Sequence, residues 1–92
     1  MGPVVVTLAD ALCAFGVGRN RPDGAAGFTT LEAKTNFLST AREGEVVTGV
    51  AEPVHIGGST QVWDATVTND STGRRMAAYR CTQLILYPRQ GA

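Results

Sequence analysis

The stretch PVVVTLADALCAF, residues 3–15, decides how this chain folds. Leu8, Leu12 and Phe15 recur at spacings of three and four residues, which is the period of an α-helix. Nearly all of its residues are apolar, so we expect a helix that is buried on most of its circumference. One carboxylate, Asp10, lies in its middle, where an unpaired buried charge is costly. That charge requires a structural or functional reason.

Two glycines follow the helix and predict where it ends. Gly16 and Gly18 stand directly after its last periodic residue, and residues 19–27 are typical of a loop. Residues 28–40 lack a helical period and are rich in Thr and Phe, which indicates a first strand.

Three further strands are predicted after that one. Residues 45–56 form the next, and Gly49 and Pro53 indicate a bulge or a sheet edge near its middle. Residues 60–68 alternate in character and are followed by the turn-forming string NDSTG. Residues 74–88 then return as a long strand, which completes an antiparallel hairpin.

One helix followed by four antiparallel strands predicts an α+β fold, in which a curved antiparallel sheet wraps one central helix. The 92 residues, 43% of them hydrophobic, fit a single domain over residues 1–92. Domains this small have thin cores, so we expect an oligomer. Eight basic and eight acidic residues balance, and the arginines are scattered, so we expect no nucleic-acid partner and no membrane partner.

Cys13 and Cys81 stand apart, without the spacing of a metal site, and are interpreted as buried thiols. Unpaired thiols are compatible with a reducing cytoplasm. The N-terminal apolar run has no basic region and contains an acid, so it does not read as a signal peptide, and it is too short to span a bilayer. We therefore expect a soluble, cytoplasmic protein.

Four strings carry a family resemblance, in order and at similar spacing: LAD at 8–10, AREG at 41–44, PVHIGGSTQVWDA at 53–65 and RCTQLIL at 80–86. With them the chain resembles the hotdog-fold acyl-CoA thioesterases, in the branch of phenylacetate-pathway and dihydroxynaphthoyl-CoA hydrolases. The resemblance covers nearly the whole chain. It implies the hotdog fold and hydrolysis of an aromatic or medium-sized acyl-CoA to free acid and coenzyme A. It implies no metal and no cofactor, because coenzyme A is part of the substrate.

The resemblance also implies an N-terminal segment that precedes the central helix. Family chains begin earlier, with another helix and strand, a Gln-containing segment and a His-Gly-Gly loop. Met1, Gly2 and Pro3 stand where that loop is expected, and only Gly2 matches it. We therefore expect an N-terminally short domain. Ala14 is a further departure, because many relatives carry Ser or Thr there to orient water or substrate.

The resemblance implies that Asp10 is the catalytic acid, as nucleophile or general base, and that the Gly2 amide is the oxyanion donor. Eight residues of helix separate these two groups by about 12 Å, whereas both must approach one carbonyl to roughly 3 Å. A homodimer with two shared sites would join Gly2 of one chain to Asp10 of the other, and we expect a dimer of dimers. The alternative is that Asp10 hydrogen-bonds a strand backbone group or lies on an exposed stripe.

Coenzyme A contacts are implied on two stretches of the chain. Their glycines let backbone approach a ligand, and their hydroxyls can bond phosphate or amide groups. Relatives often carry Arg or His at some of these positions, a lack for which Arg42 could compensate. The implied contacts are Thr30, Phe37, Leu38, Ser39, Thr40, His55, Ile56, Gly57, Gly58, Ser59 and Thr60.

Two other functions stay open at the level of sequence. One is a non-catalytic hotdog module that dimerises and binds acyl-CoA. The other is a dehydratase of the same fold. It is less favoured, because such enzymes pair a catalytic His with an acid. The only histidine of the sequence, His55, falls among the implied coenzyme A contacts. Trp63 and Tyr79 alternate on strands and are interpreted as core or interface packing.

Overall fold

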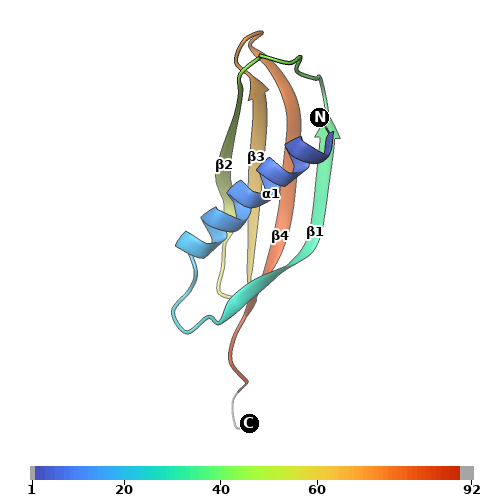
Figure 1. Ribbon diagram of the computed structural model, residues 1–92. Coiled ribbons are helices and arrows are strands. Elements are labelled where there is room, and N and C mark those ends of the chain that lie inside the picture. The colour runs from blue at the N-terminus through green and yellow to red at the C-terminus, as the bar shows by residue number, and fades with distance from the viewer. Residues whose placement is uncertain (1, 90–92) are drawn as a thin grey trace.

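The computed structural model describes residues 2–89, and they form two layers, one helix on one face of a sheet (Figure 1). The elements are α1 (Gly2–Arg19), β1 (Gly27–Phe37), β2 (Val47–Ile56), β3 (Thr60–Asn69) and β4 (Arg74–Leu86). The predicted helix and all four predicted strands are confirmed, with strand ends within three residues of those expected. The α+β architecture follows from this order.

The sheet is antiparallel throughout and has the order β1-β4-β3-β2, so the first and last strands pair. β2 is an edge strand, as predicted. Its register shifts between Pro53 and His55, which confirms the bulge at that point. The prediction of a bulge near Gly49 is wrong, because the register with β3 is continuous at that residue. Gly49 instead makes room for the helix, since a Cβ on it would lie 2.5 Å from Cδ1 of Leu12.

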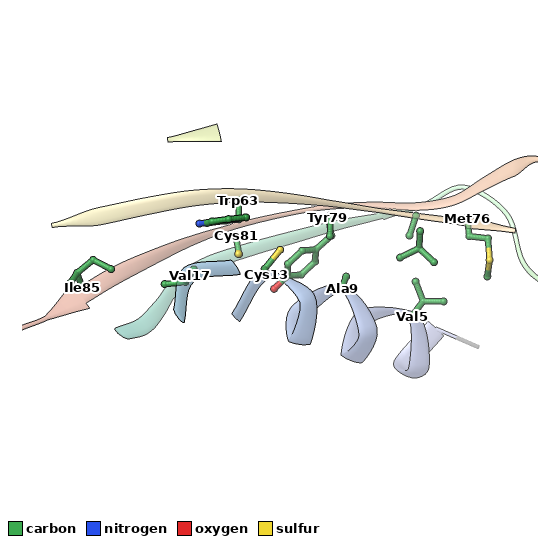
Figure 2. Packing of buried hydrophobic residues seen from close by; sticks show 12 residues of the cluster. Val5, Ala9, Cys13, Val17, Trp63, Met76, Tyr79, Cys81 and Ile85 are labelled. Carbon is green, nitrogen blue, oxygen red and sulfur yellow. The ribbon is translucent and has the colours of Figure 1, made fainter. Parts of the chain in front are cut away.

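A narrow stripe of α1 packs on the sheet and forms the core with it (Figure 2). The buried helix residues are Val5, Ala9, Cys13 and Val17, and the sheet contributes Trp63, Ala65, Val67, Met76, Ala77, Tyr79, Cys81 and Ile85. Val4 and Phe15, on the side turned away, are 64% and 65% exposed. The expectation that α1 is buried on most of its circumference is therefore wrong for one chain, because a single sheet covers only one side of it.

The predicted helix end at Gly16 is wrong, because α1 continues to Arg19. A Cβ on Gly16 would lie 2.5 Å from Cζ3 of the Trp63 ring, so this glycine serves close packing and not helix termination. The end comes at Asn20, whose backbone N–H and side-chain amide both donate to the Gly16 carbonyl, at 3.2 and 2.8 Å. A tertiary contact therefore explains the glycine that sequence interpreted as a stop.

The length of α1 also corrects a prediction about membranes. Its 18 residues, with a mean hydropathy of 1.3, are long and apolar enough to cross a membrane by length and composition alone, so the statement that the run is too short is wrong. Only 22% of it is buried within the chain. One such helix is weak evidence for a membrane, because the core helix of a globular domain passes the same test, and α1 packs on the sheet through a buried stripe.

Both cysteines are free and buried, which confirms their interpretation as buried thiols. Cys13 of α1 and Cys81 of β4 meet at the interface between helix and sheet (Figure 2). The hydrogen bond with Cys81 and burial both raise the pKa of the Cys13 thiol. It therefore stays protonated and packs as a small apolar side chain.

Gly16→Ala is expected to destabilise the fold relative to Gly18→Ala. Both changes remove a glycine from the same helix and gain up to about 1 kcal/mol of helix propensity. Only the methyl at position 16 meets the Trp63 ring, whereas nothing lies within 4 Å at position 18. Overpacking costs about 1–3 kcal/mol, so Gly16→Ala should unfold at a lower urea concentration, followed by circular dichroism. Equal midpoints for the two variants would contradict the close contact.

Candidate active site

Asp10 lies halfway along α1, and its side chain is exposed in the chain as described. Its Oδ1 accepts a hydrogen bond from the phenol Oη of Tyr79 on β4, at 2.9 Å. Of the alternatives left open by the sequence, the exposed position is confirmed, and the bond to a strand backbone group is wrong, because the partner is a strand side chain. An apolar helix can carry this charge because it is both hydrated and hydrogen-bonded.

Tyr79 reaches Asp10 from beneath the helix. Its side chain is only 4% exposed, and its cross-strand neighbours are Thr35 on β1 and Ala65 on β3. Burial and the hydrogen bond to Asp10 raise the pKa of the Tyr79 phenol above its ordinary value, so it stays a donor. Core packing of this ring is confirmed. Its bond to Asp10 was not predicted, because strand periodicity does not show which helix residue lies above a given strand position.

Gly2 is the first residue of α1, where backbone N–H groups have no partner within the helix and the dipole is positive. The Phe37 ring, at the end of β1, lies beside it, with Cε1 3.8 Å from where a Cβ of Gly2 would stand. These two predicted site residues are therefore brought together. Asp10 is eight residues further along the same straight helix, about 12 Å away, so one chain does not bring it to the same point.

A cavity of about 510 Å³ opens at this end of the sheet. Its lining is Leu38, Ser39, Thr40, Arg42, Glu45, Thr72 and Arg74. It unites three predicted coenzyme A contacts with Arg42 and with Arg74, which sequence reasoning missed. The available signal was the RR string after the predicted turn. Two guanidinium groups against one carboxylate make this cavity suitable for an anion such as a phosphate.

Two polar groups in this cavity are already bound to the chain. The Ser39 hydroxyl donates to the Arg75 carbonyl at 2.7 Å, and the backbone N–H of Arg42 donates to Oε1 of Glu45 at 2.6 Å. That backbone bond lowers the pKa of Glu45 below its ordinary value. Glu45 therefore stabilises its own loop. Among residues 2–89 it forms no ion pair with the guanidinium group of Arg42 or of Arg74.

The other predicted coenzyme A contacts lie at the hairpin between β2 and β3. The Gly57 N–H donates to the Thr60 carbonyl at 2.9 Å, which closes the turn. A Cβ on Gly57 would lie 2.7 Å from Nε2 of His55, so this glycine makes room for the imidazole. A Cβ on Gly58 would meet nothing within 4 Å, so this side of its backbone is open to approach by a ligand, whereas its carbonyl accepts a hydrogen bond from the Tyr87 phenol.

Thr30 lies near this same end and is exposed, but it joins a polar row with the buried Gln61 and Gln83 that the sequence did not reveal. Its hydroxyl donates to Oε1 of Gln83 at 3.0 Å. In the same row, Gln61 accepts from the Trp63 indole at 2.8 Å and donates to the Asn20 carbonyl at 2.9 Å. The row ties the end of α1 to the sheet, so Thr30 has a structural partner in addition to its predicted ligand.

The predicted coenzyme A contacts are therefore split between opposite ends of the molecule (Figure 1). β2 runs from one group to the other, and its ten residues span about 30 Å at the rise of a strand. The chain measures 54 × 18 × 18 Å, so this separation extends along its long axis. One chain does not bring the groups 37–40 and 55–60 together.

His55 does not form an acid–histidine pair with Asp10 within the chain. It lies opposite Val62, which sits between the buried Gln61 and Trp63 on β3 and therefore faces away from α1. The geometry disfavours the dehydratase reading. Across residues 2–89, no three His, Cys, Asp or Glu side chains gather as a metal site would require, and metal independence stays a prediction.

A sequence model of the family described as "Thioesterase superfamily" matches residues 1–76. The chain belongs to the thioesterase superfamily. The 1,4-dihydroxy-2-naphthoyl-CoA hydrolase of Listeria monocytogenes serotype 1/2a (strain 10403S) is 38% identical over 82 residues, which are 88% of this chain and 63% of that protein.

Solved structures agree with this membership. A hypothetical thioesterase from Streptococcus pneumoniae TIGR4, crystallised with coenzyme A, is 28% identical to this chain with a TM-score of 0.81. The match covers 98% of this chain and 66% of the Streptococcus chain. A Bacillus halodurans protein crystallised with CoA is 27% identical with a TM-score of 0.81, over 94% of this chain and 55% of its own. The predicted hotdog fold is thus confirmed. The chain spans less than two thirds of the length of each of these relatives.

Tyr79→Phe is expected to change how stability depends on alkaline pH. The pKa of the phenol is raised in the folded chain, so the unfolded chain, with an ordinary value of about 10, loses this proton first. The contribution of Tyr79 to the free energy of unfolding is therefore fully present below about pH 10 and is lost above it, at up to about 1.4 kcal/mol per pH unit. When urea unfolding is measured from about pH 8 to about pH 11, the free energy of unfolding should fall more steeply with pH for the wild type than for the variant. Parallel curves would refute the shift.

Proposed function

We propose that this chain hydrolyses the thioester of an acyl-CoA and releases the free acid and coenzyme A. The observation that carries the proposal is the exposed Asp10 carboxylate, held by the Tyr79 phenol on the central helix of a thioesterase-superfamily domain. The relative named as a naphthoyl-CoA hydrolase and the structures solved with coenzyme A support this substrate class. The chemistry proposed here uses no metal and no cofactor.

In this mechanism the Asp10 carboxylate acts on the thioester carbonyl in one of two ways. As a nucleophile it bonds to the carbonyl carbon and expels the coenzyme A thiolate, and water then cleaves the resulting anhydride. As a general base it takes a proton from the water that attacks the same carbon. In both routes the carbonyl oxygen gains negative charge, which the Gly2 N–H at the positive end of α1 stabilises.

The substrate class that we propose is an aromatic or medium-sized acyl-CoA. Phe37 and Leu38, both more than half exposed, lie at the end of the sheet where Phe37 adjoins Gly2, and they offer apolar contact to an acyl group. Arg42 and Arg74 in the adjoining cavity suit the phosphates of coenzyme A. The aromatic substrate named for the Listeria relative agrees with this class.

A homodimer would complete the site. β2 is a sheet edge with unpaired backbone, and four exposed aliphatic side chains lie on it or directly before it: Val46, Val50, Val54 and Ile56. Antiparallel pairing of two copies of β2 about a two-fold axis places both helices antiparallel on the same face. It also sets the hairpin 57–59 of one chain beside the loop 38–46 of the other. The split coenzyme A contacts then meet across the two chains.

A dimer of dimers is proposed through the outer face of the sheet. Register aligns Lys34, Arg80, Asp64 and Glu52 across the four strands, two positive charges followed by two negative ones. Arg80 donates to both carboxylate oxygens of Asp64, at 2.6 and 2.8 Å, and these bonds lower the pKa of Asp64. A two-fold axis would place each positive end against a negative end. The two buried free thiols favour a cytoplasmic location for this assembly.

Asp10→Asn is expected to lower the rate of acyl-CoA hydrolysis by about 100-fold or more, because an amide neither attacks a carbonyl nor accepts a proton from water. Release of the coenzyme A thiol is measured with aromatic, medium-chain and short acyl-CoA substrates. Asp23→Asn, which neutralises an exposed acid in the loop before β1, is the control and should match the wild type. Equal rates for Asp10→Asn and wild type would overturn the proposal. Coenzyme A binding without hydrolysis by the wild type would instead support the non-catalytic module.

Co-expression of Asp10→Asn chains with Gly2→Pro chains should restore activity that neither variant shows alone. Proline suits the first turn of a helix but has no N–H, so Gly2→Pro removes only the oxyanion donor. A mixed dimer keeps one site with both intact groups, and random pairing predicts recovery of about a quarter of the wild-type rate. Mixed dimers that form, as shown by differently tagged chains, and yet stay inactive would refute a shared site.

A further inference from the structure

We propose that Tyr79 is a positioning residue for the Asp10 carboxylate, an inference that rests on the function proposed above. The Tyr79 Oη donates to Oδ1 of Asp10 at 2.9 Å, across the interface between β4 and α1. Asp10 is exposed, and a carboxylate on an exposed helix surface turns about its own side-chain bonds. A bond from a fixed donor holds one oxygen, Oδ1, in place and leaves the other, Oδ2, for the substrate or for water.

Tyr79 is itself fixed by its surroundings. It stands on β4, a central strand paired on both sides, and its ring rises between sheet and helix near Cys13 and Ala9 (Figure 2). Its side chain is 4% exposed, and the neighbouring Ala65 and Ala9 are 1% and 0% exposed. A ring with two rotatable side-chain bonds, enclosed in this way, presents its hydroxyl along one direction.

The competing explanation is that Asp10 only satisfies a buried phenol, which needs an acceptor in any core. Two observations favour positioning. Asp10 is the only ionisable acid in α1, and within residues 2–89 the bond from Tyr79 is the only recorded hydrogen bond to its carboxylate. Hydroxyl-to-carboxylate bonds are among the strong ones in proteins, so this contact sets the orientation of a group whose reactivity depends on orientation.

The decisive experiment compares Tyr79→Phe with wild type in steady-state acyl-CoA hydrolysis. The variant keeps the ring and removes the donor, so kcat should fall about 10-fold while KM stays within about twofold, because Tyr79 lies beneath the helix and not against coenzyme A. Ile85→Val is the matched control, because it trims another buried side chain on the same strand without a bond to Asp10. Its kcat should match wild type. Circular dichroism establishes that each variant is folded.

A double-mutant cycle separates positioning from a general structural effect. Asp10→Glu moves the carboxylate outward by one methylene, away from the phenol, so adding Tyr79→Phe to it should lower kcat by less than about twofold. A structural role for Tyr79 would instead give the same loss in both backgrounds, and it would overturn the inference.

Failure of this inference differs from failure of the proposed function. If Asp10→Asn is inactive while Tyr79→Phe retains the wild-type kcat, or loses no more than Ile85→Val, positioning by Tyr79 is refuted and the thioesterase proposal stands. If Asp10→Asn is as active as the wild type, or if the wild type hydrolyses no acyl-CoA, both are refuted.

Discussion

The close approach of α1 to the sheet is the contact on which the rest of the structure depends. Gly16 lies against the Trp63 ring and Gly49 against Leu12, at distances that leave no room for a Cβ. Ala9 adds a third small residue on the buried stripe. Because these positions lack bulk, the helix lies low enough for the phenol of Tyr79 to span the interface and meet the one acid of α1. The site is thus a product of core packing and not of a loop.

The same packing leaves the groups of the proposed active site apart within one chain. A helix that rests on one sheet through a narrow stripe keeps apolar residues such as Phe15 exposed, and β2 carries aliphatic side chains along an unpaired edge. The proposed catalytic groups Gly2 and Asp10 are separated along α1, and the predicted coenzyme A contacts are separated along β2. α1 crosses the strands obliquely (Figure 1), and a two-fold axis that pairs two chains can bring both sets of groups together.

Local patterns predicted the elements well, because helix and strand periods are properties of neighbouring residues. The errors arose where a residue serves a distant partner. Gly16 looked like a helix stop, but its reason is Trp63 on β3, and Gly49 looked like a bulge, but its reason is Leu12 on α1. The contact of Tyr79 with Asp10 depends on which strand lies under the helix, and the pairing of β1 with β4 that sets this is not contained in any local string.

Under the proposed function, the contact of Asp10 with Tyr79 would account for the absence of a hydroxyl at Ala14. That residue is one turn further along α1, where the resemblance implies a hydroxyl that orients water or substrate, and a methyl cannot do so. In this chain a hydroxyl at Asp10 comes from Tyr79, beneath the helix, and it bonds the carboxylate itself. A donor on the sheet is held more rigidly than one on an exposed helix surface, since the ring is enclosed by the core. The orientation of the reacting group would then be set by the fold of one chain, and the oxyanion donor by its partner.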